Sequence, residues 1–392
     1  MLKSQKDVLQ NNSPRARVVR TLRDWIQNGH LEPGERLPGE MDIAEKLDVS
    51  RGTVRTALRH LEDDGIIKSI ANGRGREVAG SETRRSANPL EKFFVALSNL
   101  SEDPSRYAKS HMMWSVEAGV IDRCSRIGYH SMMLNASCLK DGSFVNMIRN
   151  SPAGILLSHN IVESGDLCRQ ALSEACAMKI PVVINGDGDG LQKFDRIISD
   201  HESGACLLAE YLIKKGCRKI LRVWSSPDVP YWVRDRNRGY EKAVLESGLK
   251  TVPSVCIDNL AVRVPGNKKN FEARTRQYMG YLVEHLTKPE PADAIMLTCD
   301  TDYFPAAAAC RFFNKVPGRD ILLVGYDNTW QECEERQWES SVPAATVDKR
   351  NFQIGGEMID LLMARINGKL PSKPQLVKIK SQLVEGGVEN GK

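Results

Sequence analysis

Arginines recur at every fourth position of one short segment, and their spacing is the first sign of chemistry in the chain. Arg51, Arg55 and Arg59 fall on one stripe of a helix predicted to begin after Ser50, whose hydroxyl suits an N-cap. The apolar residues of the same segment form a second stripe: Val54, Ala57, Leu58 and Leu61. Arginine can donate two hydrogen bonds to guanine in the major groove, and the hydroxyls of Ser50 and Thr53 can bind phosphates. The pattern indicates a helix that reads DNA.

A second positive element follows in Gly73-Arg74-Gly75-Arg76. Glycines let a backbone approach its target closely, so we expect Gly73, Arg74 and Gly75 to form a hairpin tip that reaches a phosphate or the minor groove. A row of arginines alone is more typical of a solvated basic face. The capped helix, the arginine stripe and the Gly-Arg tip together favour DNA binding.

The elements that must position these residues lie within residues 1–80. Ser13-Pro14 is a good start for a first helix, which ends at Asn28-Gly29. The predicted order is three helices and a hairpin: residues 14–27, 39–47 and 50–65, then strands 66–70 and 77–79. A short helix, a tight turn and a second helix with arginines near its start suit entry into the major groove.

This stretch resembles the GntR family of winged helix-turn-helix regulators over about residues 14–79. The matching residues are Leu31-x-Pro33-Gly34-x-x-Leu37-Pro38-x-Glu40, then Ile43-Ala44-x-x-Leu47-x-Val49-Ser50-Arg51-x-Thr53-Val54-Arg55-x-Ala57-Leu58-x-x-Leu61-x-x-x-Gly65, then the Gly73-Arg74-Gly75 tip. The resemblance implies that Arg51, Arg55 and the tip contact DNA. We also count Arg36, Glu40 and Arg59 among the DNA-binding residues. Many members carry an arginine where this chain has Met41, so one expected contact is absent or supplied elsewhere.

From residue 91 onward, short apolar strands alternate with helical stretches. The ten predicted strands are residues 93–98, 131–135, 154–158, 182–185, 196–199, 220–224, 254–257, 294–298, 321–326 and 344–347. Such alternation predicts an α/β fold, and ten strands suit two doubly wound parallel sheets better than one. The expected domains are a DNA-binding domain, a linker and an effector-binding and dimerisation domain: residues 1–80, 81–90 and 91–392. The expected lobes are lobe 1 at about 91–224 and 348–370, and lobe 2 at about 226–346 and 373–388.

The alternating region resembles the effector domain of the LacI/GalR repressors, which is similar to periplasmic sugar-binding proteins. The matches are Glu210-Tyr211-Leu212-x-x-x-Gly216, Arg234-x-Arg236-x-x-Gly239-Tyr240, Asp320-Ile321-x-x-Val324-Gly325-Tyr326-Asp327, and a tail from Thr346-Val347 through Gly355 to Gly368. A GntR-type head on a LacI-type sensor is the arrangement of arabinose-repressor-like proteins. The resemblance implies an effector between two lobes, with the chain crossing between them near residues 224–227, 347–351 and 368–374.

The resemblance also implies effector-binding residues. It places a ligand arginine at Arg234, and a guanidinium offers several donors in a fixed fork. Asp327 follows the apolar strand 321–326, so its carboxylate lies at a strand's carboxyl end, where it can accept from neighbouring hydroxyls. Candidate stacking faces for a sugar ring are Trp114, Trp232 and Trp330, although ordinary packing explains a tryptophan equally well.

Two departures from the family bear on the ligand. Cys299 stands where members often have a ligand-binding asparagine, and Lys349 is read where a glutamine is often placed. We count Cys299 and Lys349 among the effector-binding residues. Lys349 adds positive charge near the pocket mouth, so the ligand can be a phosphorylated or acidic sugar as well as a neutral one.

Composition excludes other classes of protein. The chain has 392 residues, and its net charge of +5 is too mild to prove a polyanion partner. No stretch approaches the ~18 apolar residues of a membrane span, and the start lacks a secretory signal. The ten cysteines are scattered, which predicts reduced thiols in a cytoplasm, no metal site and no cofactor.

The sequence therefore predicts a transcriptional regulator that is not an enzyme, with repression as the expected mode of control. We expect a homodimer at the nucleoid that binds double-stranded operator DNA as an inverted repeat and responds to a sugar or sugar phosphate. Two alternatives stay open at this point. One is a cytoplasmic sugar-processing enzyme with an accessory N-terminal module, and the other is a DNA-binding regulator whose sensor has lost its ligand.

Overall fold

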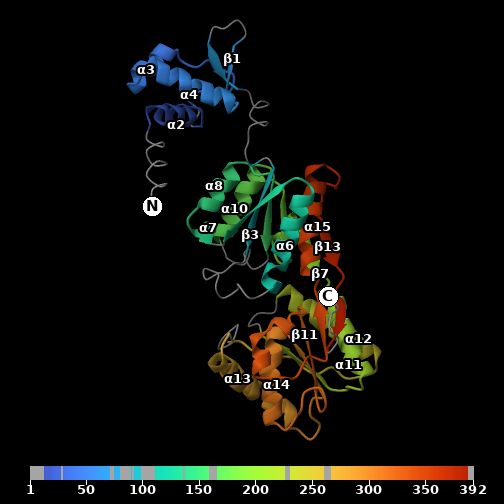
Figure 1. Cartoon of the computed structure of the whole chain (residues 1–392). Helices are drawn as coiled ribbons and strands as arrows, with labels where there is room; N and C mark the ends of the chain where they lie inside the picture. The colour runs from blue at the N-terminus through green and yellow to red at the C-terminus, as the bar shows by residue number, and fades with distance from the viewer. Residues whose placement is uncertain are drawn as a thin grey trace. The chain divides into compact units, whose positions relative to one another are not determined.

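The computed structural model describes residues 13–27, 30–70, 75–79, 90, 92–98, 111–135, 137–158, 166–225, 230–259 and 266–386. The chain divides into two compact units, residues 1–91 and residues 92–392. Figure 1 follows both units along the chain, and each is described by itself. Among the described residues, no helix combines the length and the apolar character needed to span a membrane.

The first unit is a winged helix-turn-helix domain. Its elements are α2 (Pro14–Gln27), α3 (Glu40–Leu47), α4 (Arg51–Asp63) and the antiparallel strands β1 (Ile67–Ser69) and β2 (Arg76–Val78). Ser50 caps α4, because its hydroxyl accepts a hydrogen bond from the amide of Thr53 at 3.1 Å. Asp48 ends α3 in the left-handed conformation, which turns the chain toward α4. The apolar stripe of α4 lies in the core, as predicted: Val54, Ala57, Leu58 and Leu61.

The second unit contains two six-stranded sheets with helices on both faces, the doubly wound α/β architecture that the alternation predicts. The first sheet is fully parallel, in the order β13-β7-β6-β5-β3-β4. Its strands are β3 (Phe93–Ser98), β4 (His130–Asn135), β5 (Gly154–Ser158), β6 (Val182–Asn185), β7 (Asp195–Ser199) and β13 (Leu376–Ile379). One face is covered by α6 (His111–Arg126) and α15 (Asn351–Ile366). The other face is covered by α7 (Ser137–Lys140), α8 (Ser143–Arg149) and α10 (Asp166–Ala177).

The second sheet has the order β14-β12-β11-β10-β8-β9, and its edge strand β14 is antiparallel to β12. Its strands are β8 (Ile220–Trp224), β9 (Val255–Cys256), β10 (Ala294–Leu297), β11 (Leu322–Tyr326), β12 (Ala345–Asp348) and β14 (Gln382–Glu385). Figure 1 shows helices on both sides: α11 (His201–Lys214) with α12 (Tyr231–Glu246), and α13 (Lys268–Leu286) with α14 (Tyr303–Phe312). The described part of this unit also has four short 3-10 helices: η2 (Leu191–Lys193), η3 (Asp300–Asp302), η4 (Trp330–Glu332) and η5 (Glu334–Gln337).

The helices α11 and α12 pack closely because Gly239 has no side chain. A Cβ atom at Gly239 would lie 2.0 Å from the backbone oxygen of Glu202. Any larger residue would force the helices apart, and α12 would shift relative to the strand ends that it faces. This close packing positions the polar side chains of α12 described below.

The first crossing between the lobes differs from the prediction. We predicted lobe 1 to extend to residue 224, with a crossing near 224–227. The strand β8 instead pairs with β9 and β10 in the second sheet, and α11 packs in the core of that lobe. The chain therefore crosses at Asp200, between β7 and α11. Apolar periodicity identifies a strand, but it does not say which sheet the strand joins.

The last crossing also differs, while the middle one agrees with the prediction. We predicted residues 373–388 in lobe 2 after a crossing near 368–374, but β13 lies in the first sheet and β14 in the second. The chain therefore crosses at Lys380 and Ser381, and the Ser381 hydroxyl bonds the backbone oxygen of Asp200 at 3.0 Å, joining two crossings. Between β12 and α15 the chain crosses at Lys349 and Arg350, within the predicted 347–351.

Candidate functional site

The basic face of α4 is formed in its first turns. The side chains of Arg51 and Arg55 are 58% and 48% exposed, and Arg59 is exposed one turn further along. The hydroxyls of Ser50 and Thr53 lie 2.8 Å apart at the helix start and are also exposed or half-buried. Positive side chains and hydroxyls thus share the amino-terminal part of one helix, whose opposite stripe fixes it in the core. This arrangement can offer donors to base edges and phosphates together.

Three arginines from two elements converge on the carboxylate of Glu40. Its Oε2 lies 3.1 Å from Arg51 Nε and 3.0 Å from Arg55 Nη2, and its Oε1 lies 3.4 Å from Arg76 Nη1. The hydrogen bond from Arg55, assisted by that from Arg51, lowers the pKa of Glu40 to about 2. Arg76 also contacts Glu62 at the end of α4, with Nε and Oε2 3.1 Å apart. The network therefore orients the arginines of α4 and ties β2 to the helices.

The predicted hairpin tip is described in part. Gly75 has a φ of 116°, a conformation that glycine adopts readily, and its carbonyl accepts a hydrogen bond from the Ile70 amide at 3.0 Å. Gly73 and Arg74 lie outside the described residues, so their DNA contacts stay a prediction. Arg36 is exposed and pairs with the backbone of β2, which places it beside the hairpin.

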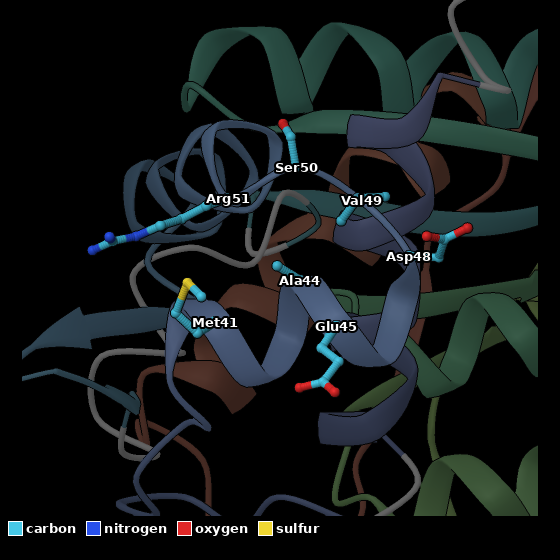
Figure 2. A pocket seen from close by; sticks show the side chains of 7 residues that line it. All are labelled: Met41, Ala44, Glu45, Asp48, Val49, Ser50 and Arg51. Carbon is cyan, nitrogen blue, oxygen red and sulfur yellow. The ribbon is translucent and has the colours of Figure 1, made fainter.

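A shallow hollow lies where α3 turns into α4. Figure 2 shows the side chains that line it: Met41, Ala44, Glu45, Asp48, Val49, Ser50 and Arg51. Met41 is 64% exposed, whereas Ile43, two residues along α3, is buried in the core. The hollow is thus bordered by the large apolar side chain of Met41 and by Arg51 of α4.

A second concentration of polar groups lies at the carboxyl end of β10 in the second sheet. Asp302 in η3 forms an ion pair with Arg274 of α13, and both side chains are almost completely buried. The hydroxyl of Ser225, which follows β8, donates to the same carboxylate at 2.7 Å. Because strand ends of a parallel sheet meet at one edge, residues far apart in sequence share this region.

Asp300 links the ends of three strands. Its carboxyl group is bonded to the hydroxyl of Thr346 at 2.8 Å and accepts a hydrogen bond from the Thr329 amide at 2.8 Å. Burial, followed by the negative charge of Asp327, raises the pKa of Asp300 to about 8. The side chain therefore carries its proton at neutral pH and acts as a hydrogen-bonded tether between β10, β12 and the loop after β11.

The pKa of Asp300 predicts how the stability of the second unit depends on pH. The folded state keeps a proton that the unfolded chain releases near its usual pKa of about 3.9, so the contribution of Asp300 to stability is largest at low pH and falls as the pH rises toward about 8. Asp300→Asn, which keeps one acceptor oxygen for the amides of Thr329 and Trp330 and cannot ionise, should flatten this decline. Melting temperatures of both proteins between about pH 5 and 8 test the prediction, and parallel curves would contradict it.

Arg236 of α12 is a second buried arginine of this region. It is 3% exposed, its Nη1 donates to the backbone oxygen of Thr298 at 2.7 Å, and its guanidinium carbon lies 3.5 Å from the ring centre of Tyr326 and 4.7 Å from that of Trp232. Its Nε has no hydrogen-bond partner among the described residues. No described carboxylate forms an ion pair with it either. A buried cation held mainly by aromatic rings keeps donors for a ligand.

Asp327 and Lys349 form an ion pair at the edge of the same region. Lys349 Nζ lies 2.6 Å from Asp327 Oδ1, and the two side chains are 21% and 5% exposed. Asp327 has a φ of 99°, and a side-chain residue held in that region stores backbone strain. The carboxylate predicted to accept ligand hydroxyls is therefore already engaged by the lysine predicted to add positive charge.

The other predicted effector residues differ from one another in burial and in the groups that they contact. Arg234 is exposed on α12 and does not share the buried position of Arg236. Trp330 packs in the hydrophobic core of the lobe, so its ring serves packing there, while Trp232 lies half-buried against Arg236. Cys299 contacts the hydroxyl of Thr301 at 3.0 Å, next to Asp300. Trp114 belongs to α6, but its side chain is outside the described part of the chain.

Sequence reasoning named Arg234 and not Arg236 as the ligand arginine of α12, although a signal for the buried position of Arg236 was available. Val233, Arg236 and Tyr240 recur at helical spacing and are all buried, whereas Arg234 falls on the opposite side. The phase of the helix, and not the distance to Gly239 alone, identifies the inward arginine. No three His, Cys, Asp or Glu side chains of the described residues gather in a way that could hold a metal ion.

Two family models match the chain. Residues 14–78 match the bacterial regulatory proteins of the gntR family, and residues 209–387 match the periplasmic binding protein-like domain. The first match spans the winged helix-turn-helix domain with Arg51 and Arg55. The second spans the carboxyl ends of β10 and β11, with Arg236, Asp327 and Lys349.

Individual proteins are also similar to the chain. The arabinose metabolism transcriptional repressor of Geobacillus stearothermophilus is 24% identical over 222 residues, which are 56% of this chain and 58% of that protein. The chain therefore spans less than two thirds of that relative. Two solved structures share the fold: a regulatory protein of the LacI family from Chloroflexus aggregans (TM-score 0.59, 20% identity, 76% of this chain and 98% of that one) and a transcriptional regulator CelR–cellobiose complex (TM-score 0.58, 18% identity, 89% and 99%).

Proposed function

Because the chain joins a GntR-type DNA-binding domain to a periplasmic-binding-protein-like domain, we propose that it is a transcriptional repressor controlled by a small sugar-like effector. The exposed arginines at the start of α4, oriented by Glu40, are the observation that carries this proposal. The similar proteins are named as transcriptional regulators, which supports a regulatory and not a catalytic role. The protein acts in the cytoplasm, at the nucleoid.

Arg51 and Arg55 supply the base contacts in the major groove. Ser50 and Thr53 bind phosphates at the helix start, and the remaining contacts come from Arg36, Arg59 and the hairpin tip with Gly73, Arg74 and Gly75. Two copies of the chain form a homodimer on an inverted repeat, with half-sites about one helical turn of DNA apart.

The effector binds at the carboxyl ends of β10 and β11. Arg236 has unused donors there, and Asp327 with Lys349 offers both an acceptor and a positive charge. Trp232 borders Arg236, and Cys299 lies in the strand-end loop. This donor set suits a sugar or a sugar phosphate, with polar groups fixing its orientation. Binding shifts the balance between lobe arrangements, and such coupling typically changes affinity by about 5- to 150-fold.

The test begins with selection of operator DNA from a random library by the full-length protein. Anisotropy titrations of the selected duplex at several salt concentrations should show affinity falling with salt, as phosphate contacts require. Thermal-shift screening against mono-, di- and phospho-sugars then identifies effectors, because a ligand of the folded state raises the melting point. An effector found in this way should weaken operator binding. Recovery of no preferred sequence, or turnover of the sugar, would contradict the proposal.

Arg236→Ala should raise the effector concentration needed for operator release by about tenfold or more, since hydrogen bonds to a charged group contribute about 1.5–3 kcal/mol. Operator binding without effector should be retained. Arg236→Lys keeps the charge and serves as a second variant in case the alanine protein folds poorly. The matched control is Arg234→Ala, which removes an exposed arginine from the same helix turn. A normal response in Arg236→Ala, or a lost response in Arg234→Ala, would move the effector site.

A further inference from the structure

Met41 leaves a large apolar surface in water beside the arginines of the reading helix. It is the second residue of α3 and directly follows Glu40, whose carboxylate holds Arg51 and Arg55. Met41 is 64% exposed, and it does not belong to the core cluster formed by the described residues of the first unit. An exposed apolar side chain gains free energy when a partner covers it. Its position makes DNA the first partner to consider.

The charges around the hollow tell which of its sides faces DNA. Figure 2 shows Met41 and Arg51 on the same side of the hollow, with Asp48 on the other side, and Glu45 also lines it. Phosphates are attracted to the side with Arg51 and repelled by the two carboxylates. The duplex therefore approaches on the side with Arg51. Because Arg51 supplies a base contact in the proposed function, a duplex read by α4 brings base edges toward Met41 on that side.

Only one base offers an apolar group in the major groove. Thymine carries a C5-methyl group there, whereas the edges of guanine, adenine and cytosine offer donors and acceptors. A thioether side chain cannot satisfy those polar edges well, and its flexible, polarisable chain adapts to a methyl group. We propose that Met41 contacts the C5-methyl group of one thymine in each operator half-site and so selects thymine at that position. The inference rests on the proposed function, since it presupposes that α4 reads DNA.

The experiment removes the methyl group and nothing else. Each thymine of the selected operator is replaced in turn by deoxyuridine, and the full-length protein is titrated with every duplex. We expect one position per half-site to lose about three- to fivefold in affinity, as burial of one methyl group implies. Met41→Ala and Met41→Gln should bind the thymine and deoxyuridine duplexes equally, whereas Met41→Leu should still prefer thymine. Arg51→Ala is the matched control from the same hollow, and it should weaken binding yet keep the thymine preference.

The outcomes separate this inference from the proposed function. A thymine preference that disappears with Met41 supports the contact. A preference that persists in Met41→Ala, or no sensitivity to any methyl group, overturns it while DNA reading by α4 stands. A change of oligomeric state in Met41→Gln with unchanged DNA binding would make this face a protein interface and would also overturn the contact. Failure to select any operator overturns the proposed function itself, and with it this inference.

Discussion

Arg51→Ala should weaken operator binding by about 5- to 150-fold, which corresponds to about 1–3 kcal/mol for a lost bidentate base contact. The loss should be accompanied by relaxed specificity at one base pair, because a truncated side chain no longer distinguishes the base that it faced. Arg55→Ala should behave similarly at a neighbouring position. Competitive titration of the operator and single-base variants measures both the affinity and the specificity.

The control must remove a positive charge without touching the reading face. Arg149→Ala does so in the other unit, where the arginine is 61% exposed and pairs with Glu174 at 3.0 Å. Its operator affinity should stay close to that of the unaltered protein. Equal losses in Arg149→Ala and Arg51→Ala would show that net charge, and not base contact, accounts for the effect. Unchanged affinity in both Arg51→Ala and Arg55→Ala would remove α4 from the DNA interface.

Asp302→Ala should destabilise the sensor by about 3–5 kcal/mol, because it strands the buried guanidinium of Arg274 without its counter-charge. Neither side chain is more than 1% exposed, so water cannot compensate for the lost partner. The hydroxyl of Ser225 also loses its acceptor. Urea denaturation followed by the fluorescence of the sensor tryptophans measures the change in the free energy of unfolding.

A double variant distinguishes the lost pairing from a general intolerance of the site. Arg274→Met with Asp302→Leu removes both charges, and it should recover much of the stability that Asp302→Ala loses. Asp166→Ala is a matched control, since its carboxylate pairs with Arg169 but is 94% exposed, and it should change stability by less than about 0.5 kcal/mol. A loss of stability in Asp166→Ala as large as that in Asp302→Ala would contradict the role of burial.

The local features of the head could be predicted from the sequence because they depend on neighbours in the chain. Ser50 caps α4 by bonding an amide three residues away, and the apolar stripe that begins at Val54 follows helical spacing alone. The ten predicted strands of the second unit also form, four with the predicted bounds and six with ends shifted by one residue. These elements are determined within a dozen residues, which is the range over which composition and periodicity carry information.

The assignment of strands to sheets could not be predicted in the same way. β13 and β14 are separated by only Lys380 and Ser381, yet they join different sheets, and neither was among the predicted strands. The Asp327–Lys349 pair likewise joins residues from two strand ends, and the Glu40 network joins three elements of the head. Each depends on tertiary contacts, so residue types and spacing named the participants without showing which partner each would meet.

The lysine that pairs with Asp327 lies on a segment that also connects the two lobes. Lys349 immediately follows β12 and precedes Arg350, whose φ of 60° turns the chain into α15 and thus into the other lobe. In the proposed function, a sugar that draws Asp327 or Lys349 away from its partner would therefore pull on the crossing between the lobes. Ligand binding and movement at the crossing would then depend on the same ion pair. No chain of contacts through the protein interior would be needed to convert ligand binding into movement.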